Sequence, residues 1–226
     1  MNAPVKLPFE RSEYAARLAR TRAAMAHKGV DLLIVTDPAN MNWLTGYDGW
    51  SFYVHQCVLV ALEGEPLWFG RGMDGNGAAR TAWISPESII RYPDNYVMST
   101  ERHPMDYLSA EVIAARGWQD KRIGVEMDNY YFSAAAFASL QKHLPQASFV
   151  DTNGLVNWQR AVKSPQEIAY MRIAARIVEK MHEKILEVIE PGMRKNELVA
   201  QIYSTAILGA GEHGGDIGVD VEAVPH

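Results

Sequence analysis

The sequence contains a single cysteine, Cys57, so no disulfide can form within one chain. Its neighbours Val58, Leu59 and Val60 are apolar, and we expect a reduced thiol within a buried strand. No apolar run approaches the ~20 residues that a membrane-spanning helix needs. The first ten residues carry two prolines instead of a charged region followed by an apolar one. We therefore expect a cytoplasmic protein that is neither secreted nor bound to a membrane.

The sequence also lacks any run of basic residues. Its 27 aspartates and glutamates outnumber its 22 lysines and arginines, which gives a formal net charge of −5. Nucleic acids and anionic membranes attract clustered basic side chains, so this composition argues against both as partners. Apolar residues make up 48% of the chain, which is enough for a substantial core. A small molecule or another protein therefore remains as the expected partner.

Motifs that bind metals or nucleotides are absent as well. The sequence has no Cys/His cluster, no HExxH and no GxSxG, so local motifs support neither a zinc peptidase nor a serine hydrolase. The glycine-rich stretch from Gly70 to Gly77 lacks the Lys-Ser/Thr of a phosphate-binding loop, and we interpret it as a turn leading into a helix. His103 precedes Pro104 at an expected helix start, where a capping or solvated role is favoured over catalysis. We expect no metal site and no cofactor.

Strand and helix patterns alternate over the first 160 residues. Short apolar runs bounded by turn residues predict strands, and apolar spacings of three to four residues predict helices. Such alternation is typical of an α/β fold with a mixed sheet flanked by helices. Strands are expected at residues 32–35, 54–62, 66–69, 88–92, 122–126 and 148–150, and helices at residues 13–28, 38–44, 104–116 and 132–143, with a glycine-rich turn or helix at 70–83.

A strong helix start divides the sequence in two. Ser164 can cap the helix, Pro165 fits its first position, and Glu167 can complete a capping box. Amphipathic helices are expected at residues 165–189 and 196–208, with no sheet on which to pack. We therefore expect a complete first domain over residues 1–160 and an incomplete second one over residues 161–226.

The segment around residue 50 is the candidate binding site. Trp50, Phe52, Tyr53 and His55 crowd onto a loop that enters an expected strand. Strand alternation would place Phe52 and Val54 on one face and Tyr53 and His55 on the other, so only one pair is needed for the core. Pocket lining and plain packing remain equally open. Aromatic faces attract a compact cation, and a tyrosine or histidine can hold a carboxylate.

Three stretches of the second half carry a recognisable pattern, namely Lys163-Ser164-Pro165-Gln166-Glu167-Ile168, Met171-Arg172-Ile173-Ala174-Ala175 and Glu190-Pro191-Gly192-Met193. They resemble the start of the catalytic domain in the creatinase, prolidase and aminopeptidase P superfamily. Residues 40–57, 100–107, 124–131 and 154–160 of the first half are closer still to the ectoine hydrolase family within it. Together the similar stretches cover residues 7–216.

The resemblance implies a creatinase-type N-terminal domain followed by the first helices of an incomplete pita-bread α+β domain. It implies hydrolytic opening of the cyclic amidine ectoine to N-acetyl-diaminobutyrate, in a homodimer whose N-terminal domain reaches the partner's active site. Phe52 falls on a position that contacts substrate in creatinase relatives, and Val54 replaces their arginine. Trp50, Phe52, Tyr53 and His55 are the expected substrate-binding residues, with His55 or Tyr53 holding the ectoine carboxylate.

The family's catalytic groups lie mostly in the second half of the catalytic domain, so the resemblance implies that this chain alone is inactive. Pro225-His226 is similar to the Pro-His that carries the family's first conserved histidine, which makes His226 the candidate catalytic residue. Two alternatives stay open. One is another superfamily hydrolase, either a creatinase-like amidinohydrolase or a Xaa-Pro metallopeptidase. The other is a non-catalytic module for dimerisation or binding.

Overall fold

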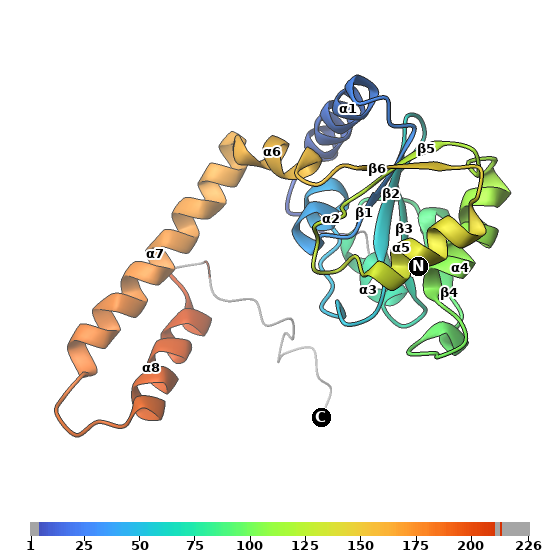
Figure 1. Ribbon diagram of the computed structural model, residues 1–226. Coiled ribbons are helices and arrows are strands. Elements are labelled where there is room, and N and C mark those ends of the chain that lie inside the picture. The colour runs from blue at the N-terminus through green and yellow to red at the C-terminus, as the bar shows by residue number, and fades with distance from the viewer. Residues whose placement is uncertain (1–4, 211–212, 214–226) are drawn as a thin grey trace, which may run out of the picture. The chain divides into compact units, whose positions relative to one another are not determined.

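The computed structural model describes residues 5–210 and residue 213 (Figure 1). The chain divides into two compact units, residues 1–162 and residues 163–226, and each is described by itself. In the described ranges no helix is long and apolar enough to cross a membrane. The first unit carries the whole six-stranded sheet and the candidate site.

The sheet of the first unit is mixed, as the sequence predicts. Its strand order is β4-β3-β2-β1-β5-β6. The pairs β1–β2 and β2–β3 are antiparallel, whereas β3–β4, β1–β5 and β5–β6 pair in parallel. The strands are β1 (Leu32–Val35), β2 (Cys57–Ala61), β3 (Leu67–Arg71), β4 (Ile89–Tyr92), β5 (Arg122–Val125) and β6 (Ser148–Asp151).

Helices cover both faces of this sheet (Figure 1). The α-helices are α1 (Arg11–His27), α2 (Pro38–Thr45), α3 (Gly75–Thr81), α4 (Pro104–Tyr107), α5 (Ala134–His143) and α6 (Leu155–Ala161). Short helical turns are η1 (Pro86–Ser88), η2 (Asp94–Tyr96), the π-helix η3 (Leu108–Ile113) and the 3₁₀ turn η4 (Ala114–Arg116).

Alternate residues of each strand supply two separate cores. Leu33 and Val35 of β1 pack with α1, α2, α3 and α6 on one face. Leu32 and Ile34 pack with α4, η3 and α5 on the other. Because both faces are covered, β1 is a continuous apolar run. The expected buried thiol is confirmed, since Cys57 is fully buried and free.

Three differences from the predicted elements bear on the site. The strand expected from Val54 begins at Cys57, because its neighbour β1 ends at Val35, the partner of Val58. The helix expected over residues 104–116 is α-helical only through Tyr107 and continues as η3 and η4. The seven-residue α6 was not predicted.

The second unit consists of two helices, α7 (Pro165–Val188) and α8 (Lys195–Leu208). The predicted capping box of α7 is confirmed, with Glu167 N donating to Ser164 Oγ at 3.1 Å and Ser164 N donating to Glu167 Oε2 at 2.7 Å. Neither helix has a buried residue in the described part of the chain. Several of their large apolar side chains are exposed, Val178 and Leu186 among them.

Candidate functional site

The aromatic loop, residues 48–55, is tied together at its two ends. Gly46, with φ of +79°, ends α2, and Gln56 directly precedes β2. Tyr47 Oη donates a hydrogen bond to Gln56 Oε1 at 2.7 Å, and both side chains are buried. A Cβ on Gly49 would collide with the Tyr47 hydroxyl, so glycine lets the loop lie close against this ring.

The loop side chains differ in exposure. Trp50 is 90% exposed and Tyr53 67% exposed, whereas Phe52 is half-buried against the core. The Phe52 ring lies 5.5 Å from that of Tyr131, which lies 5.3 Å from the almost fully exposed Tyr130. These two tyrosines extend the group of aromatic rings around Phe52. The only sequence signal for them is their place in a family-like segment between β5 and α5.

Tyr53 contacts an arginine rather than the other loop aromatics. Arg71 Nη2 lies 3.3 Å from Tyr53 Oη and its guanidinium carbon lies 5.6 Å from the tyrosine ring centre. The same guanidinium is held by both carboxylate oxygens of Asp74, at 3.0 and 3.2 Å. Asp74 balances the charge of Arg71, so the Tyr53 hydroxyl lies at a neutral pair.

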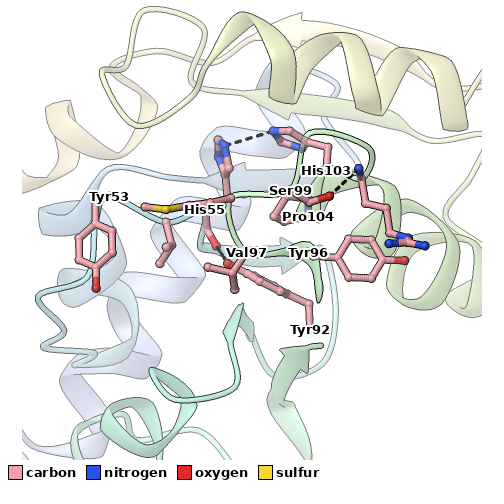
Figure 2. A pocket seen from close by; sticks show the side chains of 11 residues that line it. Tyr53, His55, Tyr92, Tyr96, Val97, Ser99, His103 and Pro104 are labelled. Carbon is pink, nitrogen blue, oxygen red and sulfur yellow. Dashed lines mark hydrogen bonds between the residues drawn. The ribbon is translucent and has the colours of Figure 1, made fainter. Parts of the chain in front are cut away.

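A pocket of about 160 Å³ lies beside the aromatic loop (Figure 2). Tyr53, Val54 and His55 line it from the loop, and residues between Tyr92 and Pro104 line it from β4 and the segment before α4. Tyr92 Oη donates to the backbone oxygen of His55 at 3.0 Å, which joins the two walls. The expected alternation of residues 52–55 across a strand is wrong, because this stretch precedes β2 and brings three consecutive residues to one pocket.

Two histidines meet at the pocket wall, facing each other in Figure 2. Their Nε2 atoms are 3.1 Å apart. His103 caps α4, and its Nδ1 accepts a hydrogen bond from the Met105 N–H at 3.1 Å. An imidazole nitrogen that accepts carries no proton, so neutral His103 is protonated at Nε2 and donates to His55 Nε2. His55 then carries its own proton on Nδ1.

Both imidazoles are held neutral. Burial, with a smaller contribution from neighbouring His103, lowers the pKa of His55 to about 4. Burial also lowers the pKa of His103, although Asp106 opposes this. His55 can therefore donate or accept a hydrogen bond near neutral pH without bringing a positive charge. The charged arginines next to the loop are Arg71 and Arg102.

The two other expectations for the site concern a catalytic residue and metal binding. His226, the candidate catalytic residue, lies outside the described residues. Within residues 5–210 and 213, no group of three or more His, Cys, Asp or Glu side chains is placed to hold a metal ion. The described site is thus an exposed aromatic loop next to a small pocket with a neutral histidine pair.

Comparison with known proteins adds a family and several relatives. Residues 17–162 match the creatinase/prolidase N-terminal domain. An ectoine hydrolase of Halomonas elongata is 60% identical over 205 residues, which are 91% of this chain and 51% of that protein. An uncharacterised hydrolase/peptidase, y4tM of Sinorhizobium fredii, is 43% identical over 92% of this chain and 53% of its own length.

Among solved structures, a Xaa-Pro dipeptidase from Bacillus anthracis is similar with a TM-score of 0.67 and 19% identity. The match covers 85% of this chain and 48% of the dipeptidase chain. At this identity the similarity establishes a shared fold alone. The chain spans about half the length of the curated relatives that it matches.

Proposed function

The chain belongs to the creatinase/prolidase N-terminal domain family, and from this premise we propose that it is the N-terminal half of an ectoine hydrolase. In the proposed reaction, water adds to the amidine carbon of ectoine and one ring C–N bond breaks. The methyl-bearing carbon becomes an acetyl amide on one nitrogen, and the other nitrogen leaves as an amine. The observation that carries this proposal is the 60% identity to the Halomonas elongata ectoine hydrolase over 91% of the chain.

In this proposal residues 1–160 form the N-terminal domain and residues 161–226 begin the pita-bread catalytic domain. The aromatic loop would contribute Trp50, Phe52 and Tyr53 to the substrate site of the partner subunit in a homodimer. The exposure of Trp50 and Tyr53 leaves their rings available for such a contact. The amidinium of ectoine is a compact cation that aromatic faces attract. His55 and the Arg71–Tyr53 contact offer donors for the carboxylate at the other end.

The test is a chimera in which this chain replaces the matching half of the Halomonas elongata enzyme. Ectoine, creatine and a Xaa-Pro dipeptide are offered separately, and products are followed by NMR. Hydrolysis of ectoine alone supports the proposal. Preferential hydrolysis of creatine or the dipeptide would transfer the assignment to another superfamily hydrolase. A folded, dimeric chimera that hydrolyses none of the three, beside an active parent enzyme, would favour a non-catalytic module and overturn it.

A further inference from the structure

We propose that the pocket beside the aromatic loop is a binding site for a small organic carboxylate with a compact apolar body. The inference rests on the proposed function for its choice of ectoine as a ligand, whereas the binding itself concerns residues of the first unit only. It rests on the charge of the lining, on the hydrogen bonds left to be made there, and on the size of the pocket.

The lining has a cation and no acid. Arg102 lines the pocket, and no aspartate or glutamate of the described part of the chain does so. The guanidinium of Arg102 has no hydrogen-bond or ion-pair partner among the described residues. By contrast, Arg71 is held by Asp74, and Arg160 bonds to Asn40 at 2.7 Å. In a chain with a net charge of −5, Arg102 is an available cation in a pocket without a counter-ion.

The polar groups of Ser99 and His55 can also donate hydrogen bonds to a ligand. Ser99 Oγ accepts from the backbone N–H groups of Glu101 and Arg102, at 3.2 and 3.1 Å, so its hydroxyl hydrogen is left to donate. The second of these bonds fixes the backbone of Arg102 beside the pocket. His55 carries its proton on Nδ1, because its Nε2 accepts from His103, and this N–H has no partner among the described residues. A carboxylate only accepts, and so matches a set of donors.

The histidine pair argues against a divalent metal ion held by both rings. Such an ion would need a lone pair from each imidazole. His103 already uses its Nδ1 lone pair to accept a hydrogen bond from the Met105 N–H. Its Nε2 carries the proton that it donates to His55 in a hydrogen bond. Binding a metal through both rings would require breaking this arrangement, whereas binding an anion leaves it intact.

The rest of the lining is apolar or aromatic and includes Tyr92, Tyr96, Val97 and Pro104. The pocket volume of about 160 Å³ is close to the ~150 Å³ of an engineered cavity that binds benzene. A ligand with a six-membered ring and one carboxylate therefore fits both the size and the chemistry. Ectoine has this form, and so does benzoate. Both ligands offer the pocket the same chemistry, and the experiment below distinguishes them.

The experiment is an NMR titration of the ¹⁵N-labelled 226-residue chain, observing the histidine rings. The ligands are ectoine, benzoate, benzyl alcohol as the uncharged analogue of benzoate, and inorganic phosphate. Substitution of His55 and His103 by glutamine assigns their signals. We expect both carboxylates to shift the His55 and His103 signals in a saturable manner, and benzyl alcohol to shift them far less. Ectoine binding much more tightly than benzoate would identify the source as the proposed substrate.

Matched variants test the role of the cation. Arg102→Gln should weaken carboxylate binding about tenfold, which corresponds to ~1.4 kcal/mol. Arg122→Gln removes another exposed arginine, at the opposite end of the sheet strands, and should leave the affinity unchanged. The proposal is overturned if neither carboxylate shifts the two signals, if Arg102→Gln binds as tightly as the parent chain, or if phosphate binds as tightly as benzoate. None of these results depends on whether the chimera hydrolyses ectoine.

Discussion

The side-chain amide of Asn40 donates a hydrogen bond to Glu126 Oε1 at 2.6 Å, joining the first turn of α2 to the end of β5. The other carboxylate oxygen accepts from the backbone N–H groups of Thr36 and Asp37, at 2.7 and 2.8 Å. Glu126 is only 2% exposed, and burial raises its pKa although these hydrogen bonds oppose the shift. The carboxylate thus accepts hydrogen bonds from the N–H groups at the start of α2, the helix that leads into the aromatic loop.

Replacing Glu126 by glutamine should destabilise the first unit by about 1–3 kcal/mol, because a buried donor then loses its acceptor. The new amide nitrogen would face the Asn40 amide nitrogen. Asn40 cannot simply turn over, since its Nδ2 also donates to Asn157 Oδ1 at 2.9 Å and its Oδ1 accepts from Arg160. The free energy of unfolding is measured in urea by tryptophan fluorescence.

Glu111→Gln is the control for this change, since Glu111 is exposed on η3. It should alter the free energy of unfolding by no more than ~0.5 kcal/mol. If Glu126→Gln were as stable as this control, the carboxylate would contribute nothing that an amide could not replace.

Much of this framework can be read from the sequence, because its signals are local. Asp37 caps α2 by accepting from Asn40 N at 2.9 Å, and Ser164 with Glu167 starts α7, as their spacing predicts. The strand β1 follows from four apolar residues between two aspartates. Capping and burial of this kind depend on neighbours within a few positions.

The pocket could not be predicted in the same way. The place of His103 before Pro104 predicts a capping or a solvated role, and the structure shows that it caps α4. Its contact with His55, however, joins residues 48 positions apart, which no local spacing reveals. The helix α6 was missed because seven residues give too few turns for a periodic pattern.

The histidine pair should make the free energy of unfolding decrease as the pH falls. The pKa of His55 is about 4 in the folded chain, against an ordinary value of 6.5 that we expect after unfolding. Below pH 6.5 the unfolded chain therefore takes up a proton that the folded chain excludes. The free energy of unfolding should decrease as the pH falls from 6.5 to 4, and His103, whose pKa is also lowered, acts in the same direction.

Urea midpoints measured across this pH range test the assignment. His55→Gln should show a smaller decrease than the parent chain, because the variant has one less proton to take up on unfolding. His27→Gln, at the exposed end of α1, serves as the control and should keep the parent's profile. Equal profiles for all three chains would mean that the half-buried histidine pair does not titrate as described.

The hydrogen bond that closes the aromatic loop can be tested separately. Tyr47→Phe should cost about 1–3 kcal/mol, because Gln56 Oε1 then loses its donor inside the core. The Nε2 of Gln56 already lacks a protein partner among the described residues. The Val54 N–H, which donates to Ser51 O at 3.1 Å within the loop, should exchange faster with solvent deuterium.

Tyr130→Phe is the matched control, since this hydroxyl belongs to a side chain that is 95% exposed. It should leave both the free energy of unfolding and the exchange of the Val54 N–H unchanged. Unaltered exchange in Tyr47→Phe would show that the loop is held by packing of the ring alone.

The proposed contact between the aromatic loop and ectoine predicts a loss of catalysis without a loss of folding. In the active chimera, Trp50→Ala should lower kcat/KM for ectoine by up to about tenfold, the range of one desolvated cation–π contact. Trp50 is 90% exposed in this chain, so its removal should hardly change stability.

Trp158→Ala removes a tryptophan that is 80% exposed on α6 and should leave kcat/KM unchanged. If both substitutions were neutral, Trp50 would lie outside the substrate site, and the exposure of this ring would require another explanation. If both lowered kcat/KM equally, the loss would reflect the general removal of surface tryptophan and not a contact with the amidinium.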